Sequence, residues 1–287
     1  MSEPAGLAGG FSRFRIDFAY DGTDFNGWAK QPGLRTVQGD LLAVLEQIFG
    51  ESENDFGMRV AGRTDAGVHA DHQVCHIDLS EAQLKRLGRT PLTATRLNNL
   101  LPADIAVHSV TEAADGFDAR FSAIGRSYKY LITDGLCKPN PKRARYALSL
   151  KKELDVDLMQ KATLLLVGLK DFGAFCKPRE GATTIRELRT LSVTRLPDSS
   201  VEVFLEADAF CHNMVRAIVG SLIAVGEKRQ SLDELKQMQE AAKRGAKVKV
   251  VDPRGLTLDA ISYPSDEKLA EQAQRARRRR TAEEISV

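Results

Sequence analysis

The sequence predicts an α+β fold made of two lobes that share a mostly antiparallel sheet. Two patterns support this class. Polar and apolar residues alternate in several segments, such as 13–20 and 201–210, and this alternation is typical of strands. Other segments, such as 36–50, repeat their apolar residues at helical spacing. Because each half of the chain contains the same mix, we expect the lobes to meet near residue 115.

The composition is that of an ordinary globular protein. The chain has 287 residues, of which 43% are hydrophobic and 28% are charged, with a formal net charge of +2. Its longest apolar runs, such as 164–169, are far too short to cross a bilayer, so we expect no contact with membranes. The first residues lack the charged and apolar regions of a signal peptide. We therefore expect a cytoplasmic protein.

The four cysteines, Cys75, Cys137, Cys176 and Cys211, are widely spaced and form no C-x-x-C pair. Disulfides are rare in the reducing cytoplasm, so the simplest expectation is four free thiols. A structural zinc site would need paired ligands at short spacing, which these cysteines lack.

In the first half, the clearest elements are a strand and the helix that follows it. Residues 13–20 alternate as a strand, and a loop rich in Gly and Asp comes next. The segment 36–50 is predicted to be a helix, with Thr36 as the N-cap and Gly50 at its exit. The further elements expected in this half are strands near 57–62, at 73–80 and at 105–113, and a helix at about 90–100.

The second half predicts a similar series. The segment 201–210 alternates as a strand and leads into an apolar helix at 211–226. The further elements expected here are strands at 127–134, 185–196 and 256–263 and a helix at 156–168. This order gives an N-terminal lobe at 11–115, a C-terminal lobe at 116–265 and a polar tail at 266–287.

The tail is rich in arginine and ends RARRRRTAEEISV. Blocks of like charge are usually solvated, so a solvated end, helical or disordered, is the simpler interpretation. An arm that binds RNA without sequence preference is the alternative. The sequence leaves both open.

The segment with the densest polar groups is AGRTDAGVHA, residues 61–70. Glycines on both sides of Asp65 permit a tight backbone and the close approach of a ligand. Arg63, two residues away, helps to keep that carboxylate ionised if the fold brings the two together. The same residues also suit a turn stabilised by local hydrogen bonds, and the segment by itself does not decide between a turn and a site.

This segment resembles the signature loop of the tRNA pseudouridine synthase A (TruA) family. Further stretches resemble motifs of that family in the same order, and the similarity covers about residues 13–264. Ala29 after Trp28 departs from the family pattern, at no catalytic position. The matching stretches are YDGTDFNGW at 20–28, RTVQGDL at 35–41, RLNNLLPADIAV at 96–107, FDARFSAIGRSYKYLI at 117–132, FCHNMVRAIVGSL at 210–222 and GLTLDAISYP at 255–264.

The resemblance implies an isomerase with the pseudouridine synthase fold and an active-site cleft between its lobes. Members detach uracil from C1′ of its ribose, turn the base and rejoin it through C5, in the anticodon arm of tRNA at positions 38, 39 and 40. Because nothing is oxidised and no group is lost, no cofactor and no metal is expected. The family also implies that tRNA is the partner and that the protein is a homodimer.

The family's catalytic residues match three positions of this sequence. Asp65 is the expected nucleophile, because a carboxylate suits the positive character that develops at C1′; direct attack on C1′ and proton abstraction at C2′ both stay open. Tyr128 matches the tyrosine that stacks on the target base, and its hydroxyl suits proton transfer at C5. Arg216 matches the partner of the catalytic carboxylate. Without the resemblance, Tyr128 would be interpreted as a residue that packs across a sheet, and Arg216 as a residue at the helix surface.

Two substrate-binding roles follow from the same match. Arg63 is expected to take the space that the target base leaves when it is extruded from the stack. Leu256 or Leu258 resembles an apolar residue that lines the uracil pocket. We assign Leu256, although the spacing fits both.

Two other classes of function stay open. A protein that holds tRNA without reacting would not need the three catalytic residues together. A metal-dependent hydrolase would need ligands, and His69, His72 and His76 have the spacing of a metal site on a helix. His76 lies in 73–80, however, which alternates like a strand, so we expect no metal there.

Overall fold

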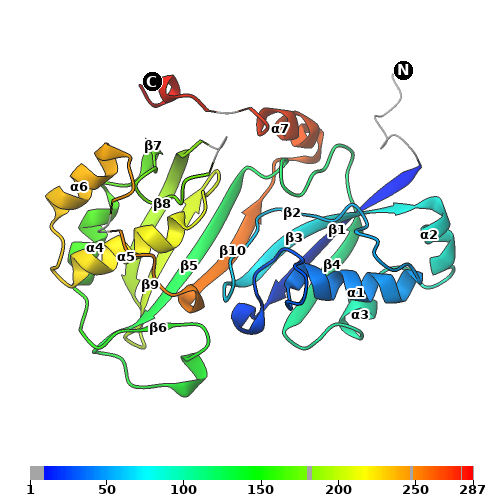
Figure 1. The fold of residues 1–287 in the computed structure, drawn as a ribbon, viewed down its shortest axis with the longest axis horizontal. Coiled ribbons are helices and arrows are strands. Elements are labelled where there is room, and N and C mark those ends of the chain that lie inside the picture. Colours follow the sequence, from blue (N-terminus) through cyan, green and yellow to red (C-terminus); the bar gives the residue numbers. More distant parts are fainter. Residues whose placement is uncertain (1–9, 180–182, 246–247, 279, 287) are drawn as a thin grey trace. The chain divides into compact units, whose positions relative to one another are not determined.

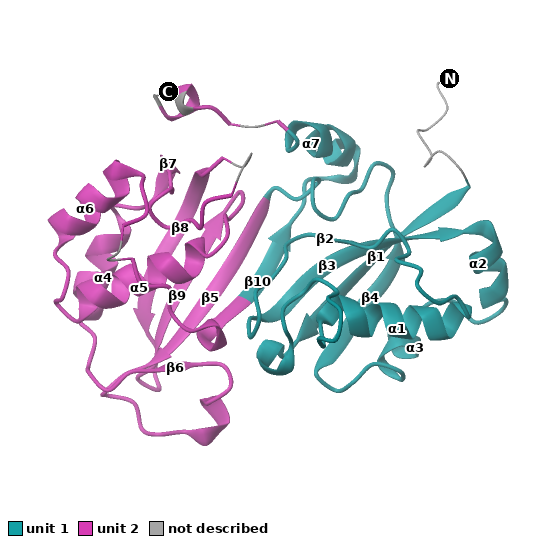
Figure 2. Ribbon diagram, in the orientation of Figure 1, with its two compact units in different colours: residues 1–124, 258–277 teal, residues 125–257, 278–287 magenta. Residues whose placement is uncertain are grey.

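The chain forms two compact units, which Figure 2 distinguishes by colour. The computed structural model describes residues 10–179, 183–245, 248–278 and 280–286. Unit 1 comprises residues 1–124 and 258–277, and unit 2 comprises residues 125–257 and 278–287. The first unit therefore extends past residue 115. It also includes a late segment of the chain, because that segment contributes a strand next to β3 (His69–Ser80) of unit 1.

Unit 1 is built on an antiparallel sheet. β1 lies between β3 and β4 and is antiparallel to both, and β10 is the neighbour of β3 on its other side. Ile16 at the middle of β1 faces Cys75 on one side and Val110 on the other. The strands are β1 (Phe11–Tyr20), β2 (Arg59–Val60), β3 (His69–Ser80), β4 (Ile105–Glu112) and β10 (Leu256–Ser262), the last of which starts in unit 2.

Helix α1 (Val37–Phe49) begins and ends where its sequence predicts. The Thr36 side chain accepts a hydrogen bond from the amide of Gly39, which satisfies one of the free amides of the first turn. Gly50 ends the helix in the left-handed region with a φ of 63°. α1 runs along the sheet in Figure 1 and buries its apolar side. The other helices described in this unit are α2 (Glu81–Leu87), α3 (Ala94–Asn98) and α7 (Leu269–Arg275), with short 3-10 turns η1 (Gly22–Asp24) and η4 (Asp266–Lys268).

The main strands of unit 2 are antiparallel neighbours in the order β5, β9, β8, β7, and a short strand, β6, runs parallel to β5. Helices α4, α5 and α6 lie beside this sheet in Figure 1. α5 is almost wholly buried, as its apolar sequence requires. The strands are β5 (Gly125–Thr133), β6 (Leu148–Ser149), β7 (Gly168–Asp171), β8 (Ile185–Arg195) and β9 (Val201–Ala207); the helices are α4 (Val156–Thr163), α5 (Met214–Gly226) and α6 (Leu232–Ala241), with 3-10 turns η2 (Pro141–Arg143), η3 (Pro253–Gly255) and η5 (Ala282–Ser286).

Several expected elements differ in length from those observed. The helix expected at 156–168 ends at Thr163, because the chain from Gly168 forms β7 and pairs with β8. The helix expected from 211 begins at Met214, after Asn213 in the left-handed region. The helix expected at about 90–100 forms only at Ala94–Asn98. Helices α2 and α6 and strands β6 and β7 were not expected.

The expectation of four free thiols is wrong for one pair. Cys176 and Cys211 form a disulfide with their Cα atoms 5.6 Å apart, a separation usual for such bonds. The amide of Lys177 donates to the carbonyl of His212 over 2.9 Å, so the two loops run side by side although 35 residues separate the cysteines. Cys75, buried in unit 1, and Cys137, half-buried in unit 2, are free thiols.

The described residues include no helix that is both long and apolar enough to cross a membrane. The apolar α5 has 13 residues, whereas a helix that crosses a bilayer needs about 20. Its apolar residues are buried within unit 2 instead.

Candidate active site

Asp65 lies in the loop between β2 and β3, within unit 1. The amide of Val68 donates to the carbonyl of Asp65 over 3.2 Å, which closes a turn directly after the half-buried aspartate. On the other side, the amide of Trp28 donates to the carbonyl of Thr64 over 3.1 Å. The side chains of Trp28 and Val68, whose amides donate these two hydrogen bonds, are both buried. The backbone at Asp65 is therefore held by residues inside the fold.

The segment before α1 approaches the Asp65 loop so closely that it needs a glycine. Gly27 has a φ of 86°, and a Cβ there would meet the carbonyl oxygen of Thr64 at 3.0 Å. The amide of Gly67 also donates to the carbonyl of Phe25 over 3.2 Å. A side chain at position 27 would therefore push the loop away, and glycine is the residue that tolerates both the contact and the positive φ.

A buried polar chain fixes the residue immediately before Asp65. The side-chain nitrogen of Gln73, Nε2, donates to the Tyr20 hydroxyl over 3.3 Å and to the carbonyl of Gly62 over 2.8 Å. The Tyr20 hydroxyl lies 2.7 Å from Oγ1 of Thr64, and either hydroxyl can donate in this hydrogen bond. Burial raises the pKa of Tyr20 to about 12, so this phenol stays protonated at neutral pH.

The three histidines of this region have separate structural partners. His69 and His76 both belong to β3, so they do not share the face of a helix. Nδ1 of His69 accepts from the amide of Gly22 over 3.1 Å, and Nδ1 of His76 accepts from the amide of Ala119 over 3.0 Å. His72 contacts Asp17. Among the residues that the structure describes, no group of three or more His, Cys, Asp or Glu is arranged to hold a metal ion.

Tyr128 lies in β5 of unit 2 and is only 8% exposed. It pairs with Leu205 of β9 across the sheet. Its ring meets the ring of Phe210 edge to face, with 5.1 Å between the centroids. This geometry is a favourable aromatic contact and fixes the orientation of the tyrosine ring.

Arg216 lies in the first turn of α5 and is hydrogen-bonded to the chain at Val251, just before η3. Its Nε donates to the carbonyl of Val251 over 2.7 Å, and the amide of Val251 donates to the carbonyl of Arg216 over 3.3 Å. Next to this contact, the Tyr130 hydroxyl donates to the carbonyl of Asp252 over 2.6 Å. Although burial alone would raise the pKa of Asp252, the Arg254 and Arg216 guanidinium groups and the Arg254 amide keep it below its usual value.

We expect Gly220→Ala to destabilise the protein. A Cβ at Gly220 would collide with the carbonyl of Lys249, in the segment that anchors Arg216. Overpacking of this kind costs about 1–3 kcal/mol, against a smaller gain in helix propensity. Urea unfolding should therefore show a lower midpoint. Gly245→Ala is the matched control, because a Cβ there meets nothing within 4 Å, and equal midpoints for the two variants would contradict the collision.

The residues matched to substrate binding lie in both units. Arg63, in the Asp65 loop of unit 1, is exposed. Leu256 is 5% exposed and opens β10 in unit 2, whereas Leu258 is fully buried and belongs to unit 1. Because side chains alternate along a strand, these two leucines face the same side of β10. Asp65 and Arg63 thus belong to one unit, and Tyr128, Arg216 and Leu256 to the other.

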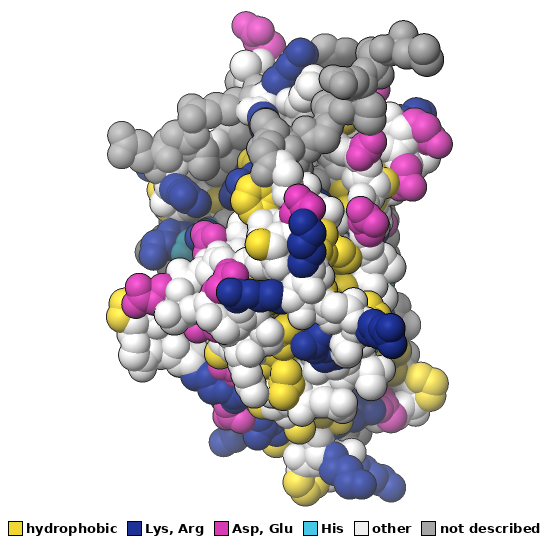
Figure 3. Space-filling model, turned by 90° about the vertical axis from the view of Figure 1, so that its right-hand side faces the viewer, with side chains coloured by type: hydrophobic (Ala, Val, Ile, Leu, Met, Phe, Trp, Pro, Cys, Tyr) yellow, Lys and Arg dark blue, Asp and Glu magenta, His cyan; other side chains and the backbone are white. Residues whose placement is uncertain are grey.

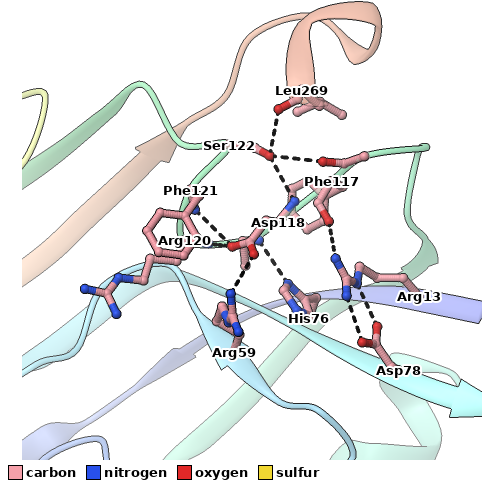
Figure 4. Close-up of polar contacts among 12 residues, drawn as sticks. Arg13, Arg59, His76, Asp78, Phe117, Asp118, Arg120, Phe121, Ser122 and Leu269 are labelled. Atoms are coloured by element: carbon pink, nitrogen blue, oxygen red, sulfur yellow. Dashed lines mark hydrogen bonds and ion pairs between the residues drawn. The ribbon is translucent and has the colours of Figure 1, made fainter. Parts of the chain in front are cut away.

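A polar cluster in unit 1 that the sequence did not predict is drawn in Figure 4. Its centre is Asp118, whose carboxylate accepts from the amides of Arg120 and Phe121 over 2.9 and 3.0 Å and from a guanidinium nitrogen of Arg59 over 2.9 Å. Burial alone would raise the pKa of Asp118, but these donors and the nearby His76 hold it below its usual value. The only sequence signal was that Asp118 lies in the motif FDARFSA, which by itself assigns it no role.

His76 completes this cluster as a neutral ring. Burial, reinforced by the Arg13 guanidinium, lowers the pKa of His76 to about 4. The ring is therefore uncharged at neutral pH, which agrees with Nδ1 accepting from the Ala119 amide. Arg13 itself forms a two-pronged ion pair with Asp78, with both contacts at 2.7 Å, and donates to the carbonyl of Phe117.

Among solved structures, a chain in a structure of an H/ACA RNP bound to a substrate RNA containing 2′-deoxyuridine is 11% identical, with a TM-score of 0.33 over 74% of this chain and 44% of that chain. A likeness of this size carries no weight for the fold or for the site. The comparisons of sequence are much closer.

A family profile described as tRNA pseudouridine synthase matches residues 162–264. Proteins named tRNA pseudouridine synthase A match nearly the whole chain. That of Streptomyces avermitilis is 46% identical and covers 95% of both chains; that of Cutibacterium acnes is 44% identical, over 96% of this chain and 97% of its own. That of Leifsonia xyli subsp. xyli is 44% identical, over 94% of this chain and 98% of its own. This chain therefore belongs to the tRNA pseudouridine synthase A family.

Proposed function

We propose that this protein isomerises uridine to pseudouridine in the anticodon arm of tRNA, at positions 38, 39 and 40, with Asp65 as the nucleophile. The observation that carries the proposal is the 46% identity over 95% of the chain to a protein named tRNA pseudouridine synthase A. The anchored turn at Asp65 supports the assignment of the nucleophile, because a catalytic carboxylate must be held in a fixed position.

The chemistry needs no group beyond the side chains of the protein. The bond between N1 of uracil and C1′ breaks, the base turns, and a bond forms between C5 and C1′. N1 gains a proton and C5 loses one, so the product is an isomer of the substrate. C1′ becomes electron-poor as its bond to the base breaks, and a carboxylate stabilises or attacks such a centre in glycosidases as well.

The other residues have distinct parts in this proposal. Tyr128 stacks on the extruded base and serves proton transfer at C5. Arg216 keeps the catalytic carboxylate ionised, since a nearby cation favours the charged form. Arg63 fills the space of the extruded base, and its exposed position suits a residue that enters RNA. Leu256 lines the uracil pocket, for which its burial at the start of β10 is suitable.

The test follows the hydrogen at C5. With tRNA labelled with tritium at C5 of uridine, the proposed enzyme releases tritium to water in step with the pseudouridine that it forms. A protein that only holds tRNA would bind the same RNA and release none. Tight binding without release by the wild-type protein would overturn the proposed activity.

We expect Tyr128→Phe to retain tRNA binding and to turn over roughly a hundredfold more slowly, because stacking survives while proton transfer loses its hydroxyl. Single-turnover tritium release and filter binding measure the two effects separately. Tyr146→Phe is the control, since Tyr146 is an exposed tyrosine of the same unit. An unchanged rate in Tyr128→Phe would limit Tyr128 to stacking.

The family also supports proposals about where the protein acts and about its oligomeric state. We place its activity in the cytoplasm and expect it to act as a homodimer with tRNA as its partner. Sedimentation of the purified protein tests the oligomeric state, and a monomer at micromolar concentration would contradict it.

A further inference from the structure

A buried, uncharged network of side chains contacts the loop that carries Asp65 in unit 1. Its three members are Tyr20 at the end of β1, Gln73 in β3 and Thr64, the residue before Asp65. Their exposed fractions are 4%, 0% and 7%. We call these three residues the loop clamp, because their side chains hold the chain just before the proposed nucleophile.

Gln73 sets the geometry of the loop clamp. Its Nε2 donates to the carbonyl of Gly62 and to the Tyr20 hydroxyl, and its Oε1 accepts from the amide of Val74. A carbonyl can only accept a hydrogen bond, so the nitrogen of the Gln73 side chain must face Gly62. Both ends of this fully buried amide group therefore have partners, and its orientation is fixed.

Tyr20 links Gln73 to Thr64. Its hydroxyl lies 2.7 Å from Oγ1 of Thr64. Its ring packs among aromatic side chains, with its centroid 6.0 Å from that of Phe18 and 6.4 Å from that of Phe25. These ring contacts do not involve the hydroxyl. The variant Tyr20→Phe would therefore keep the packing and lose only the hydrogen bonds.

The loop clamp leaves the chain around Asp65 little freedom. Gly62 is held through its carbonyl and Thr64 through its side chain, and Arg63 lies between the two. Beyond Asp65, the amide of Val68 closes the turn. Arg63 is exposed and Asp65 is half-buried. The two side chains proposed to meet the RNA thus belong to a segment that is held on both sides.

We propose that Tyr20 is a positioning residue for catalysis, which acts through Thr64 to hold the Asp65 carboxylate against the target ribose. This inference rests on the proposed function, which makes Asp65 the nucleophile. Because Tyr20 is buried, its effect must pass through the loop. A displacement of about 1 Å at a reacting group can slow a reaction about a hundredfold, so we expect the loop clamp to affect turnover rather than binding.

The first test compares Tyr20→Phe with wild type. Single-turnover tritium release should slow by between about tenfold and about a hundredfold, while the affinity for tRNA in filter binding stays unchanged. Tyr263→Phe is the matched control, because it also removes a phenol hydroxyl of unit 1, one that donates to the carbonyl of Ala119 over 2.7 Å. It should turn over at the wild-type rate. A wild-type rate in Tyr20→Phe, or an equal loss in both variants, would overturn the inference.

A double-mutant cycle tests whether Tyr20 acts through Thr64. Thr64→Val replaces the hydroxyl by a methyl group and should slow tritium release as much as Tyr20→Phe. The double variant should be no slower than either single variant, because both changes remove the same hydrogen bond. Thr64→Ser keeps the hydroxyl and should retain most of the wild-type rate. Losses that multiply in the double variant would show that the two residues act independently, against the inference.

Salt separates the loop clamp from charges at the surface. Basic and acidic side chains are interspersed on the face seen in Figure 3, and salt screens such exposed charges. The loop clamp is buried and uncharged. At saturating enzyme, the ratio of the wild-type rate to the Tyr20→Phe rate should therefore be the same at about 50 and about 200 mM salt. A ratio that changes with salt would contradict the positioning role.

Hydrogen exchange gives a readout that does not depend on activity. The Trp28 amide donates to the carbonyl of Thr64 over 3.1 Å, so it should exchange faster in Tyr20→Phe than in wild type. Unchanged exchange at this amide would overturn the loop clamp, whatever the activity of the protein. Faster exchange together with no tritium release by the wild type would instead count against the proposed function.

Discussion

Asp65→Asn should lower pseudouridine formation by roughly four orders of magnitude or more, the size of effect seen when a nucleophile is removed from an enzyme. The variant keeps the volume of the side chain and both backbone contacts that hold the loop, the Val68 amide on the Asp65 carbonyl and the Trp28 amide on the Thr64 carbonyl. Its fold and its affinity for tRNA should therefore remain those of the wild type. Single-turnover tritium release measures the first quantity, and filter binding measures the second.

The control for this experiment is Asp71→Asn. Asp71 is an exposed carboxylate of β3, a few residues beyond the loop. Its replacement by Asn removes the same charge from the same region. It should turn over at the wild-type rate. Equal activity in Asp65→Asn and wild type would contradict the assignment of the nucleophile. Uridine deuterated at C2′ then separates the two routes, because a slower reaction is expected only if the C2′ hydrogen is removed.

Asp134→Asn should destabilise the protein by about 3 kcal/mol, because it breaks a buried ion pair and leaves Arg195 without its counter-charge. The Asp134 side chain is fully buried, and its carboxylate accepts from Arg195 over 2.8 and 3.1 Å. It also accepts from the amides of Leu154 and Leu136. Chemical unfolding measures the loss. Glu240→Gln is the control, because the Lys236–Glu240 pair is exposed and such pairs contribute about 0–1 kcal/mol.

The Asp134–Arg195 ion pair should also make the stability of the fold depend on pH. Burial alone would raise the pKa of Asp134, but the hydrogen bonds from Arg195, Leu154 and Leu136 hold it below its usual value. A carboxyl whose pKa is lower in the folded state stabilises the fold above the unfolded pKa of about 4 and loses that contribution as pH falls through the folded value. Wild type should therefore lose more stability than Asp134→Asn between pH 5 and acid pH. Parallel curves for the two proteins would contradict the role of this pair.

Local signals predicted the elements that depend only on neighbouring residues. Thr36 and Gly50 mark the ends of α1 because a cap acts on amides and carbonyls within the same turn. The alternation in 73–80 identified a strand because side chains point to opposite faces along it. β3 nevertheless starts earlier, at His69, where its pairing with β1 continues beyond the alternating residues.

Signals were misleading where one pattern fits two structures. The apolar run at 164–167 suits a helix as well as a buried strand, and the expected helix continued through it. The chain leaves the helix at Thr163 instead, and Gly168, with a φ of 112°, opens β7. The boundary between the units was also placed early, since the return of β10 to the side of β3 is a tertiary pairing.

The parts of the site that the sequence did not predict come from residues far apart in the chain. Tyr20 and Gln73 support Thr64 from two different strands, and neither belongs to the signature loop at 61–70. The disulfide joins cysteines 35 residues apart. Arg59, Arg120 and Arg277, whose guanidinium groups lie over the Phe121 ring, likewise come from separate parts of the chain, so that no window of the sequence contains them. By contrast, Asp65 could be singled out because its motif is contiguous in the sequence.

The most direct test of the proposed function is to sequence pseudouridines in tRNA from cells that contain or lack this protein. We predict that uridines at positions 38, 39 and 40 of the anticodon arm remain unmodified without the protein. The wild-type gene should restore the pseudouridines, and the Asp65→Asn form should not. Unchanged pseudouridine at these positions in the absence of the protein, or restoration by Asp65→Asn, would contradict the proposed function.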